Sequence, residues 1–421
     1  MRQRLLVWTA ACCALLTLCS GNAAPDAAGL TLDEALARVL ERNPTLQAAG
    51  LASRAAAARI RQAAQPNPWR AGLELENFAG NGATRGIAAL ETTLSLSRVL
   101  QTGAQPRLRG ELARQEAALL DTEQEGQRLD LLADGAQRFI AVAATQARVQ
   151  IAAAARDAAA LTLAAVERRV HAGKSADAER ATAAIALARA ELDLAGVDSE
   201  FESARQALAT TWGETAPDFD RVAADLYDLP AVAPYATLET WLAHNPDLAR
   251  YATTARINAA RAQLARAARR PDVELAAGVR HLSEPNDTAL VLSASLPLGA
   301  ARRAGPAIDE AEAQTLREPL LAEERRLALH STLFALHRQL AHGRAAVAIL
   351  RERIIPAATR ALDDYRRGYD AGRYAWLELV NAQDTLRDAQ RELLDTAASW
   401  HRTRIELDRL TGGRLLTGDA S

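Results

Sequence analysis

The chain has 421 residues, enough for two or three ordinary domains, yet aromatic residues make up only 4% of it. A thick globular core needs bulkier side chains, so this composition favours thin layers of helices that meet along alanine and leucine seams. The formal net charge of -2 excludes the basic profile of a nucleic-acid-binding protein, and no nucleic-acid partner is expected.

Residues 1–24 have the features of a secretory signal peptide. Arg2 and Arg4 precede an apolar run at 5–18, and small residues at 21–24 offer a cleavage site. All 3 cysteines lie inside this segment, so no disulfide and no cysteine-based metal site is expected in the processed chain. Leu18 before Cys19 is a poor lipoprotein signal, which leaves lipidation as the less favoured alternative.

The segment after residue 24 is expected to be exported without a membrane-spanning helix. Once Arg2 and Arg4 are removed with the signal peptide, 48 basic and 52 acidic residues remain. No later segment offers the ~18 uninterrupted apolar residues that a spanning helix needs. If this chain crosses a membrane, it is therefore expected to do so with strands.

Two short helices are predicted next, and their pattern occurs twice. Thr31 followed by Glu34 forms a capping box at the start of one helix, and the pair Asn43-Pro44 starts another. The same order returns at Thr237 and at Asn245-Pro246. A duplication therefore covers both halves of the exported chain.

Alternating apolar and polar residues follow each pair of short helices. This period of two predicts a strand hairpin at about 69–98 and a second at about 272–297, each with one apolar and one polar face. Four such strands cannot satisfy their own edges, and their apolar face is unsuited to water.

Long helical segments of period 3.6 come after each strand hairpin. They turn back at Gly173 and at Gly372, where glycine supplies the positive φ that closes a helix. The resulting helical hairpins are predicted at about 104–212 and at about 300–411, and a register of 199 residues links the tip of the first to the tip of the second. On these segments alone, a soluble coiled-coil hairpin is an equal alternative.

These elements divide the chain into two repeats. The signal peptide covers 1–24, the first repeat 25–213, a proline-containing linker 214–236, the second repeat 237–413 and a C-terminal tail 414–421. The fold class predicted is mainly α with a small transmembrane β part, in which each unit joins a long helical hairpin to a two-stranded β-hairpin. Because barrels need closed pairing, three chains with four strands each would form a 12-stranded barrel continued by an α-helical tunnel.

This order of elements resembles the TolC-type outer-membrane efflux proteins. The motifs that carry the resemblance are the segment 31–36 with Asn43-Pro44, the segment 365–369 with Gly372, and the segment 410–412. More narrowly, the segments 75–82 and 91–97 resemble the CzcC branch, which comprises outer-membrane components of heavy-metal cation efflux.

The resemblance implies a homotrimer in the cell outer membrane, in contact with its lipid, with a helical part that extends into the periplasm. It further implies two partners, a periplasmic adaptor and an inner-membrane RND pump that supplies the energy. The chain itself has no phosphate-binding motif of the G-x-x-x-x-G-K-[ST] type, and no cofactor is expected. Since the cargo is selected mostly by the pump, drug efflux and type I secretion stay open beside metal efflux.

The resemblance also assigns two candidate sites. Exposed residues at the two helical tips are expected to dock the adaptor, and these five tip residues are Gly173, Lys174, Gly372, Arg373 and Tyr374. A pore constriction is expected at Glu378 and Asn381, which lie three positions apart and therefore share a helix face. The family pattern has carboxylates at both constriction positions, so the amide of Asn381 is a departure. The alternative is that Glu378 is simply a solvated residue beside the tip, with no role in a pore.

No catalytic or metal-binding constellation is recognised, and the chain is not expected to be an enzyme. The 7 histidines are scattered without an H-E-x-x-H motif. His330 and His337 lie seven positions apart, which more often marks an interhelix or solvated face than a metal site. A periplasmic scaffold or adaptor without a pore explains the helical hairpins but not the strands, and a porin-like channel explains the strands but not the long helices.

Overall fold

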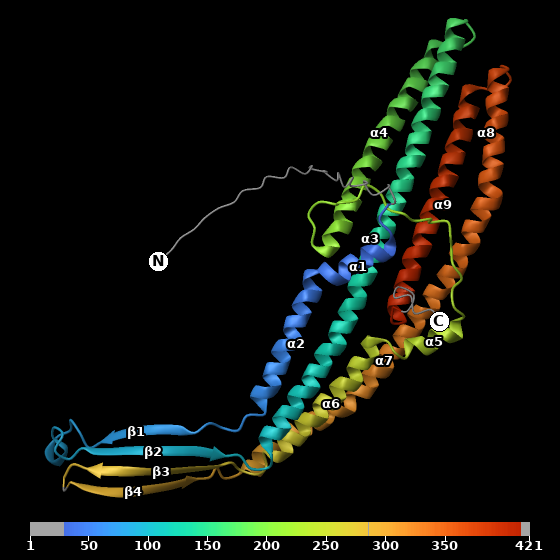
Figure 1. Ribbon diagram of the computed structural model, residues 1–421. Helices are drawn as coiled ribbons and strands as arrows, with labels where there is room; N and C mark the ends of the chain where they lie inside the picture. Colours follow the sequence, from blue (N-terminus) through green and yellow to red (C-terminus); the bar gives the residue numbers. More distant parts are fainter. Residues whose placement is uncertain (1–28, 285, 414–421) are drawn as a thin grey trace, which may run out of the picture.

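The computed structural model describes residues 29–284 and 286–413, and the predicted signal peptide and C-terminal tail lie outside these ranges. The molecule is elongated: two helical hairpins extend to one end and a small sheet extends to the other (Figure 1). The mainly helical fold with a small β part, predicted from the sequence, is confirmed.

The two repeats contain the same series of elements. The first comprises α1 (Leu32–Arg42), α2 (Pro44–Ala63), β1 (Arg70–Glu76), a 3-10 turn (Gly82–Thr84), β2 (Glu91–Leu100), α3 (Gln105–His171), α4 (Asp177–Ala209) and a 3-10 turn (Thr210–Trp212). The second comprises α5 (Tyr235–Leu242), α6 (Pro246–Ala267), β3 (Val273–Leu282), β4 (Asp287–Ser295), α7 (Ala300–Ile349), a π-helical turn (Leu350–Ile354), α8 (Ile355–Asp370) and α9 (Trp376–Leu410).

Helix α3 is the central element of the helical part. At 67 residues it is about 100 Å long. It contacts α2, α4, α6 and α9, so it joins both repeats along most of its length. The main apolar core lies at mid-length, where Val39 of α1, Phe139 of α3 and Leu394 of α9 are almost fully buried. A second cluster around Trp400 packs α5 and α7 against α9.

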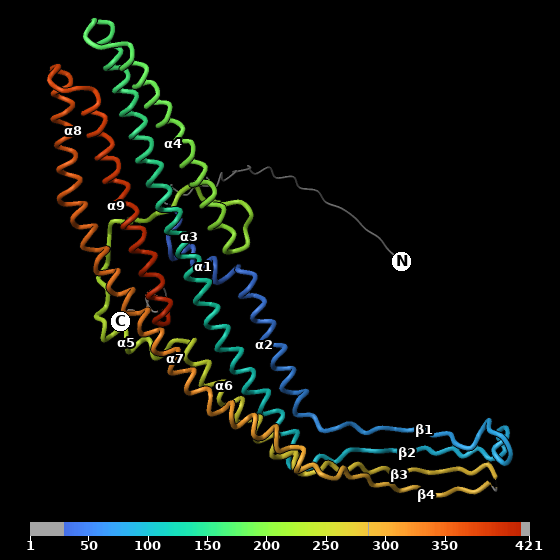
Figure 2. The backbone as a smooth tube through the Cα atoms, turned by 180° about the vertical axis from the view of Figure 1, so that it is seen from behind, coloured from blue at the N-terminus to red at the C-terminus, as the bar shows by residue number. Residues whose placement is uncertain are grey.

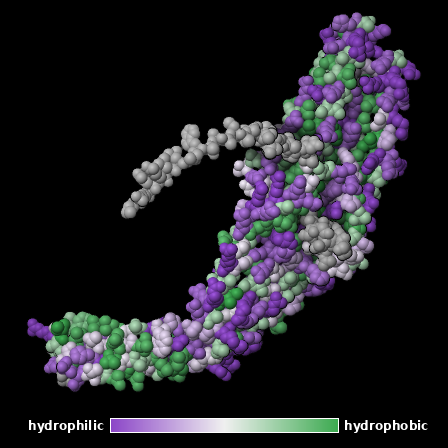
Figure 3. Space-filling view, viewed as in Figure 1, coloured by the Kyte–Doolittle hydropathy of each residue, from purple (hydrophilic) through white to green (hydrophobic). Residues whose placement is uncertain are grey.

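The four strands form one antiparallel sheet in the order β1-β2-β3-β4, so the two hairpins pair with each other through β2 and β3. The register places Leu73, Leu94, Val279 and Leu290 in one row across the sheet. All four side chains are exposed, and apolar residues gather over the strands in the space-filling view (Figure 3). Within the described residues, the outer edges of β1 and β4 have no strand partner.

The linker between the repeats is fixed to both of them. Leu30 and the segment 221–223 exchange backbone hydrogen bonds of 3.0 and 2.9 Å. The side-chain amide of Gln146 pairs with both the N–H and the carbonyl of Val222, at 3.0 and 3.2 Å. His401 Nε2 lies 3.0 Å from Leu226 O. Burial lowers the pKa of His401, which favours the neutral ring with its N–H directed at this carbonyl. The linker therefore runs along the helices between the repeats (Figure 2).

Two details differ from the sequence-based interpretation. Thr31 caps α1 in a capping box as predicted, but its repeat Thr237 lies inside α5, because that helix begins a turn earlier, after Pro234. The long helix of the second repeat also contains the π-helical turn before Pro356, whereas α3 is continuous. Proline has no N–H to donate, so the ladder of helical hydrogen bonds is altered at this point.

One helix has an apolar stretch that is interrupted by polar residues. Helix α3 contains an 18-residue stretch with a mean hydropathy of 1.4, enough by length and composition alone for a membrane span. Polar residues interrupt this stretch, as predicted, but its many alanines keep the mean hydropathy high. Only 17% of this stretch is buried in the single chain. Most of its other residues are partly buried against the neighbouring helices.

The repeated Asn-Pro pairs have a structural role. Asn245 caps α6 by accepting from the Asp247 N–H at 2.7 Å, and its Nδ2 donates to the Leu410 carbonyl at 2.7 Å. Asn43 makes the matching contacts at the start of α2, with Nδ2 donating to Thr211 O at 2.7 Å. Each asparagine thus links a short helix to the end of the returning helix of its own repeat.

Replacing Asn245 with alanine is expected to lower the free energy of unfolding by about 2–4 kcal/mol, because a helix cap is lost and a buried carbonyl loses its donor. Urea unfolding of the purified protein, followed by circular dichroism, measures this. Asn43→Ala should cost a similar amount, and the control Thr45→Ala, at an exposed position, should change little. A loss below about 0.5 kcal/mol for both asparagines would show that these contacts contribute little.

Candidate functional site

The tip of the first helical hairpin is closed by a glycine in the left-handed region. Gly173 has φ 68°, and its N–H donates to Val170 O at 2.9 Å. The next N–H, of Lys174, reaches back to Arg169 O at 2.8 Å. These two bonds satisfy carbonyls at the end of α3 and reverse the chain toward α4.

The second tip repeats this geometry between α8 and α9. Gly372 has φ 72°, its N–H donates to Tyr369 O at 3.0 Å, and the Arg373 N–H donates to Gly368 O at 2.8 Å. A Cβ at Gly372 would meet no atom within 4 Å, as is also true at Gly173. The requirement for glycine therefore comes from the backbone conformation and not from a lack of space.

All five tip residues are exposed, and they lie at the end of the molecule opposite the sheet (Figure 1). Lys174 and Arg373 add positive charge to the two tips. Tyr374 is 42% exposed, and its ring packs against Tyr365 with 4.9 Å between centroids. The tips therefore present glycine backbone, two cations and one tyrosine edge to any partner that approaches from this end.

The two tips are joined by a contact that the sequence analysis did not foresee. Arg169 of α3 donates from Nη1 to Tyr369 O at 2.8 Å, and its guanidinium lies 4.6 Å from the centre of the Tyr369 ring. Tyr369 is almost fully buried in a small cluster with Val166, Ala183 and Leu379, and burial raises the pKa of its phenol. Both hairpins are thus held together a turn below the exposed tip.

The predicted constriction residues both lie on the exposed surface of α9, one turn apart. Glu378 Oε2 accepts from the Ala375 N–H at 2.8 Å, so this carboxylate caps the start of its own helix. Asn381 carries an exposed amide, and its backbone carbonyl accepts from Thr385 Oγ1 at 2.7 Å. Glu378 therefore has a local structural role, which any test of a pore role must separate from its charge.

The histidines are not gathered into a site. His330 of α7 has Nδ1 3.0 Å from the Tyr235 hydroxyl and Nε2 2.6 Å from Glu239 Oε1, so it bridges to α5. The ring of His337 packs edge-on against the same tyrosine. Over residues 29–284 and 286–413, no group of three or more His, Cys, Asp or Glu is arranged to hold a metal ion.

The contact between Arg169 and Tyr369 had no signal in the sequence that could identify it. The two residues lie 200 positions apart, and the internal repeat aligns Arg169 with Gly368 instead. Only the close packing of the two hairpins brings them together.

Comparison with known proteins gives consistent matches. Residues 237–413 match the model of the outer membrane efflux protein family. The chain is 28% identical over 393 residues to the cobalt-zinc-cadmium resistance protein CzcC of Cupriavidus metallidurans, which covers 92% of this chain and 91% of CzcC.

Solved structures of membrane proteins, among them outer-membrane channels, have the same fold. CusC matches with a TM-score of 0.74 at 20% identity, covering 90% of this chain and 91% of CusC. The outer membrane protein VceC of Vibrio cholerae matches with a TM-score of 0.71 at 18% identity, covering 90% of this chain and 96% of VceC. The open state of MtrE from Neisseria gonorrhoeae matches with a TM-score of 0.71 at 20% identity, covering 90% of this chain and 88% of MtrE.

Proposed function

We propose that this chain, whose residues 237–413 match the outer membrane efflux protein family, is the outer-membrane duct of a tripartite system that exports divalent heavy-metal cations. The observation that carries the choice of cargo is the similarity to CzcC, a cobalt-zinc-cadmium resistance protein, along 92% of the chain. Family members are outer-membrane efflux proteins, and the chain is accordingly not an enzyme.

The unpaired sheet edges favour assembly with further copies of the same chain. A transmembrane barrel needs every strand edge paired, and four strands from each of three copies close a 12-stranded barrel. The exposed leucines of the sheet would then face lipid. We therefore infer a homotrimer.

The two exposed tips are the part of the duct that would meet a periplasmic adaptor and, through it, an inner-membrane RND pump. Support for this placement is their distance from the sheet and their exposure. The arrangement suits passive conduction, because a tightly binding metal site in the duct would slow the release of the cargo.

Deletion of the gene is expected to lower tolerance of the host cell to cobalt, zinc or cadmium, with little change in tolerance to hydrophobic drugs. The reason is that cations delivered by the pump would have no route across the outer membrane. Growth of the deletion strain on graded concentrations of each compound measures this, with a plasmid copy of the gene as the rescue control.

A deletion strain with unchanged metal tolerance and raised sensitivity to dyes or detergents would contradict the proposed cargo and favour a drug-efflux duct. A strain with unchanged tolerance to both, and a defect in an exported protein, would favour type I secretion.

A further inference from the structure

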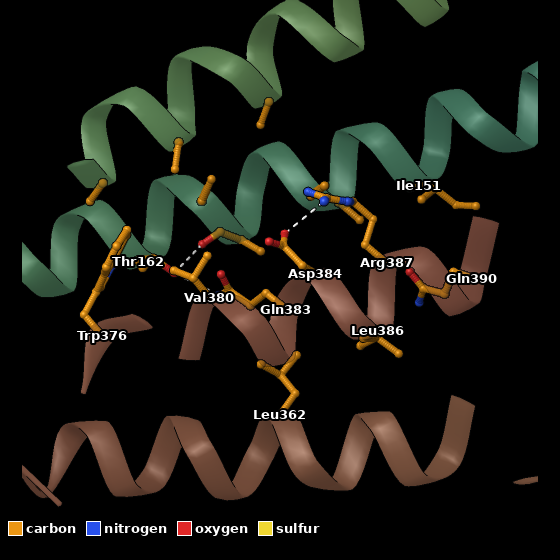
Figure 4. Close-up of a pocket in the computed structure, with 17 residues that line it drawn as sticks. Ile151, Thr162, Leu362, Trp376, Val380, Gln383, Asp384, Leu386, Arg387 and Gln390 are labelled. Carbon is orange, nitrogen blue, oxygen red and sulfur yellow. Dashed lines mark hydrogen bonds and ion pairs between the residues drawn. The ribbon is translucent and has the colours of Figure 1, made fainter. Parts of the chain in front are cut away.

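A cavity of about 200 Å³ lies between the two helical hairpins, below the tips. One wall consists of seven alanines from α3 and α4, and the other is formed by α9 with Leu362 of α8. Figure 4 shows Trp376 at one end, the pair Thr162–Gln383 beside it, and the ion pair Asp384–Arg387 farther along α9. This alanine-lined slot belongs to neither candidate site described above.

Two polar groups at the slot, Trp376 Nε1 and Arg387 Nε, have no hydrogen-bond partner among the described residues. The indole Nε1 of Trp376 is buried, and no acceptor for it lies within the described residues. Of its neighbours, Gln383 Nε2 donates to Thr162 Oγ1 at 2.9 Å, and Arg387 Nη2 pairs with Asp384 at 2.9 Å, while Arg387 Nε is also buried without a hydrogen-bond partner. A buried donor without an acceptor is costly, so an acceptor placed in the slot would be favoured.

We propose that this slot binds a small uncharged aromatic molecule that carries a carbonyl group, with the carbonyl accepting from Trp376 Nε1–H. The alanine wall suits a flat apolar ring. An apolar cavity of about 150 Å³ in another protein accommodates benzene, so about 200 Å³ suits one aromatic ring with a fused or attached carbonyl-bearing group. Because the slot is formed by both hairpins, a bound molecule contacts both repeats and resists their relative movement.

The probe we choose is 1-indanone, and its matched control is indane, which has the same rings without the carbonyl. Saturation-transfer NMR titrations of the purified full-length protein in detergent would give both affinities, with empty micelles as the blank. A hydrogen bond of ordinary strength predicts that 1-indanone binds about 2- to 10-fold more tightly than indane.

Three variants locate the site. Trp376→Phe keeps a ring but removes the donor, so 1-indanone should lose its advantage while indane binding stays the same. Ala186→Leu fills the slot from α4 and should abolish binding of both compounds. The control Ala184→Leu, at an exposed alanine of the same helix outside the slot, should leave both unchanged.

The outcomes that would overturn the proposal are specific. They are binding no stronger than to empty micelles, binding unaffected by Ala186→Leu, or an equal loss of both compounds in Trp376→Phe. If Ala186→Leu does not fold, Ala159→Leu fills the same slot from α3 and replaces it.

Discussion

Replacing Gly372 with valine is expected to abolish export while assembly and membrane insertion survive. Gly372 has φ 72°, and a β-branched residue in this region costs about 1–2 kcal/mol. The strain would be relieved by opening the turn that sets the positions of Arg373 and Tyr374. A partner protein that binds this turn would then bind about 10-fold or more weakly.

Metal tolerance of cells that carry the Gly372→Val protein measures this effect, together with the amount of protein in the outer membrane. Gly299→Val is a matched control, because Gly299 also has positive φ, 78°, and also has open space around its Cβ position, but lies at the sheet end. If Gly372→Val supports export as well as the parent does, the tip is not the docking surface.

Removing the charge of Glu378 is expected to lower the preference of the reconstituted pore for cations. On the proposed trimer, three copies of this carboxylate would lie at the constriction. At an effective dielectric constant of about 20, one carboxylate 5 Å from a monovalent cation stabilises it by about 3 kcal/mol. Cation selectivity should therefore fall about 10-fold or more in Glu378→Gln, and Asn381→Asp should raise it.

The capping contact of Glu378 decides which substitution to use. Glutamine still offers an oxygen to the Ala375 N–H, so Glu378→Gln preserves the helix start and changes only the charge. Glu378→Ala removes both the charge and the capping oxygen, and it serves as the control for the structural role. Reversal potentials under a salt gradient give the selectivity of each pore. Parent-like potentials in both Glu378→Gln and Asn381→Asp would place the constriction elsewhere.

The elements that the sequence predicted best are those with a strong local signal. Gly173 and Gly372 both adopt the positive φ inferred from their position after long periodic segments. The alternation of apolar residues predicted two strand hairpins with one apolar face, and Leu73 and Leu94 do lie in one row of the sheet. In these cases the chemistry of a few neighbouring residues determines the local structure.

Features that depend on contacts between distant segments were not predictable. The pairing of β2 with β3 and the contact between Arg169 and Tyr369 join the two repeats, and no local pattern encodes them. The capping role of Glu378 was also missed, although the spacing from Ala375 to Glu378 matches a cap.

The mass of the complex extracted from the outer-membrane fraction tests the central claim most directly. After cell fractionation and mild detergent extraction, light scattering coupled to size-exclusion chromatography should give three processed chains for each particle, because the edges of β1 and β4 need partners. Recovery of the protein as a soluble monomer from the periplasmic extract would contradict the account of this chain as an outer-membrane duct.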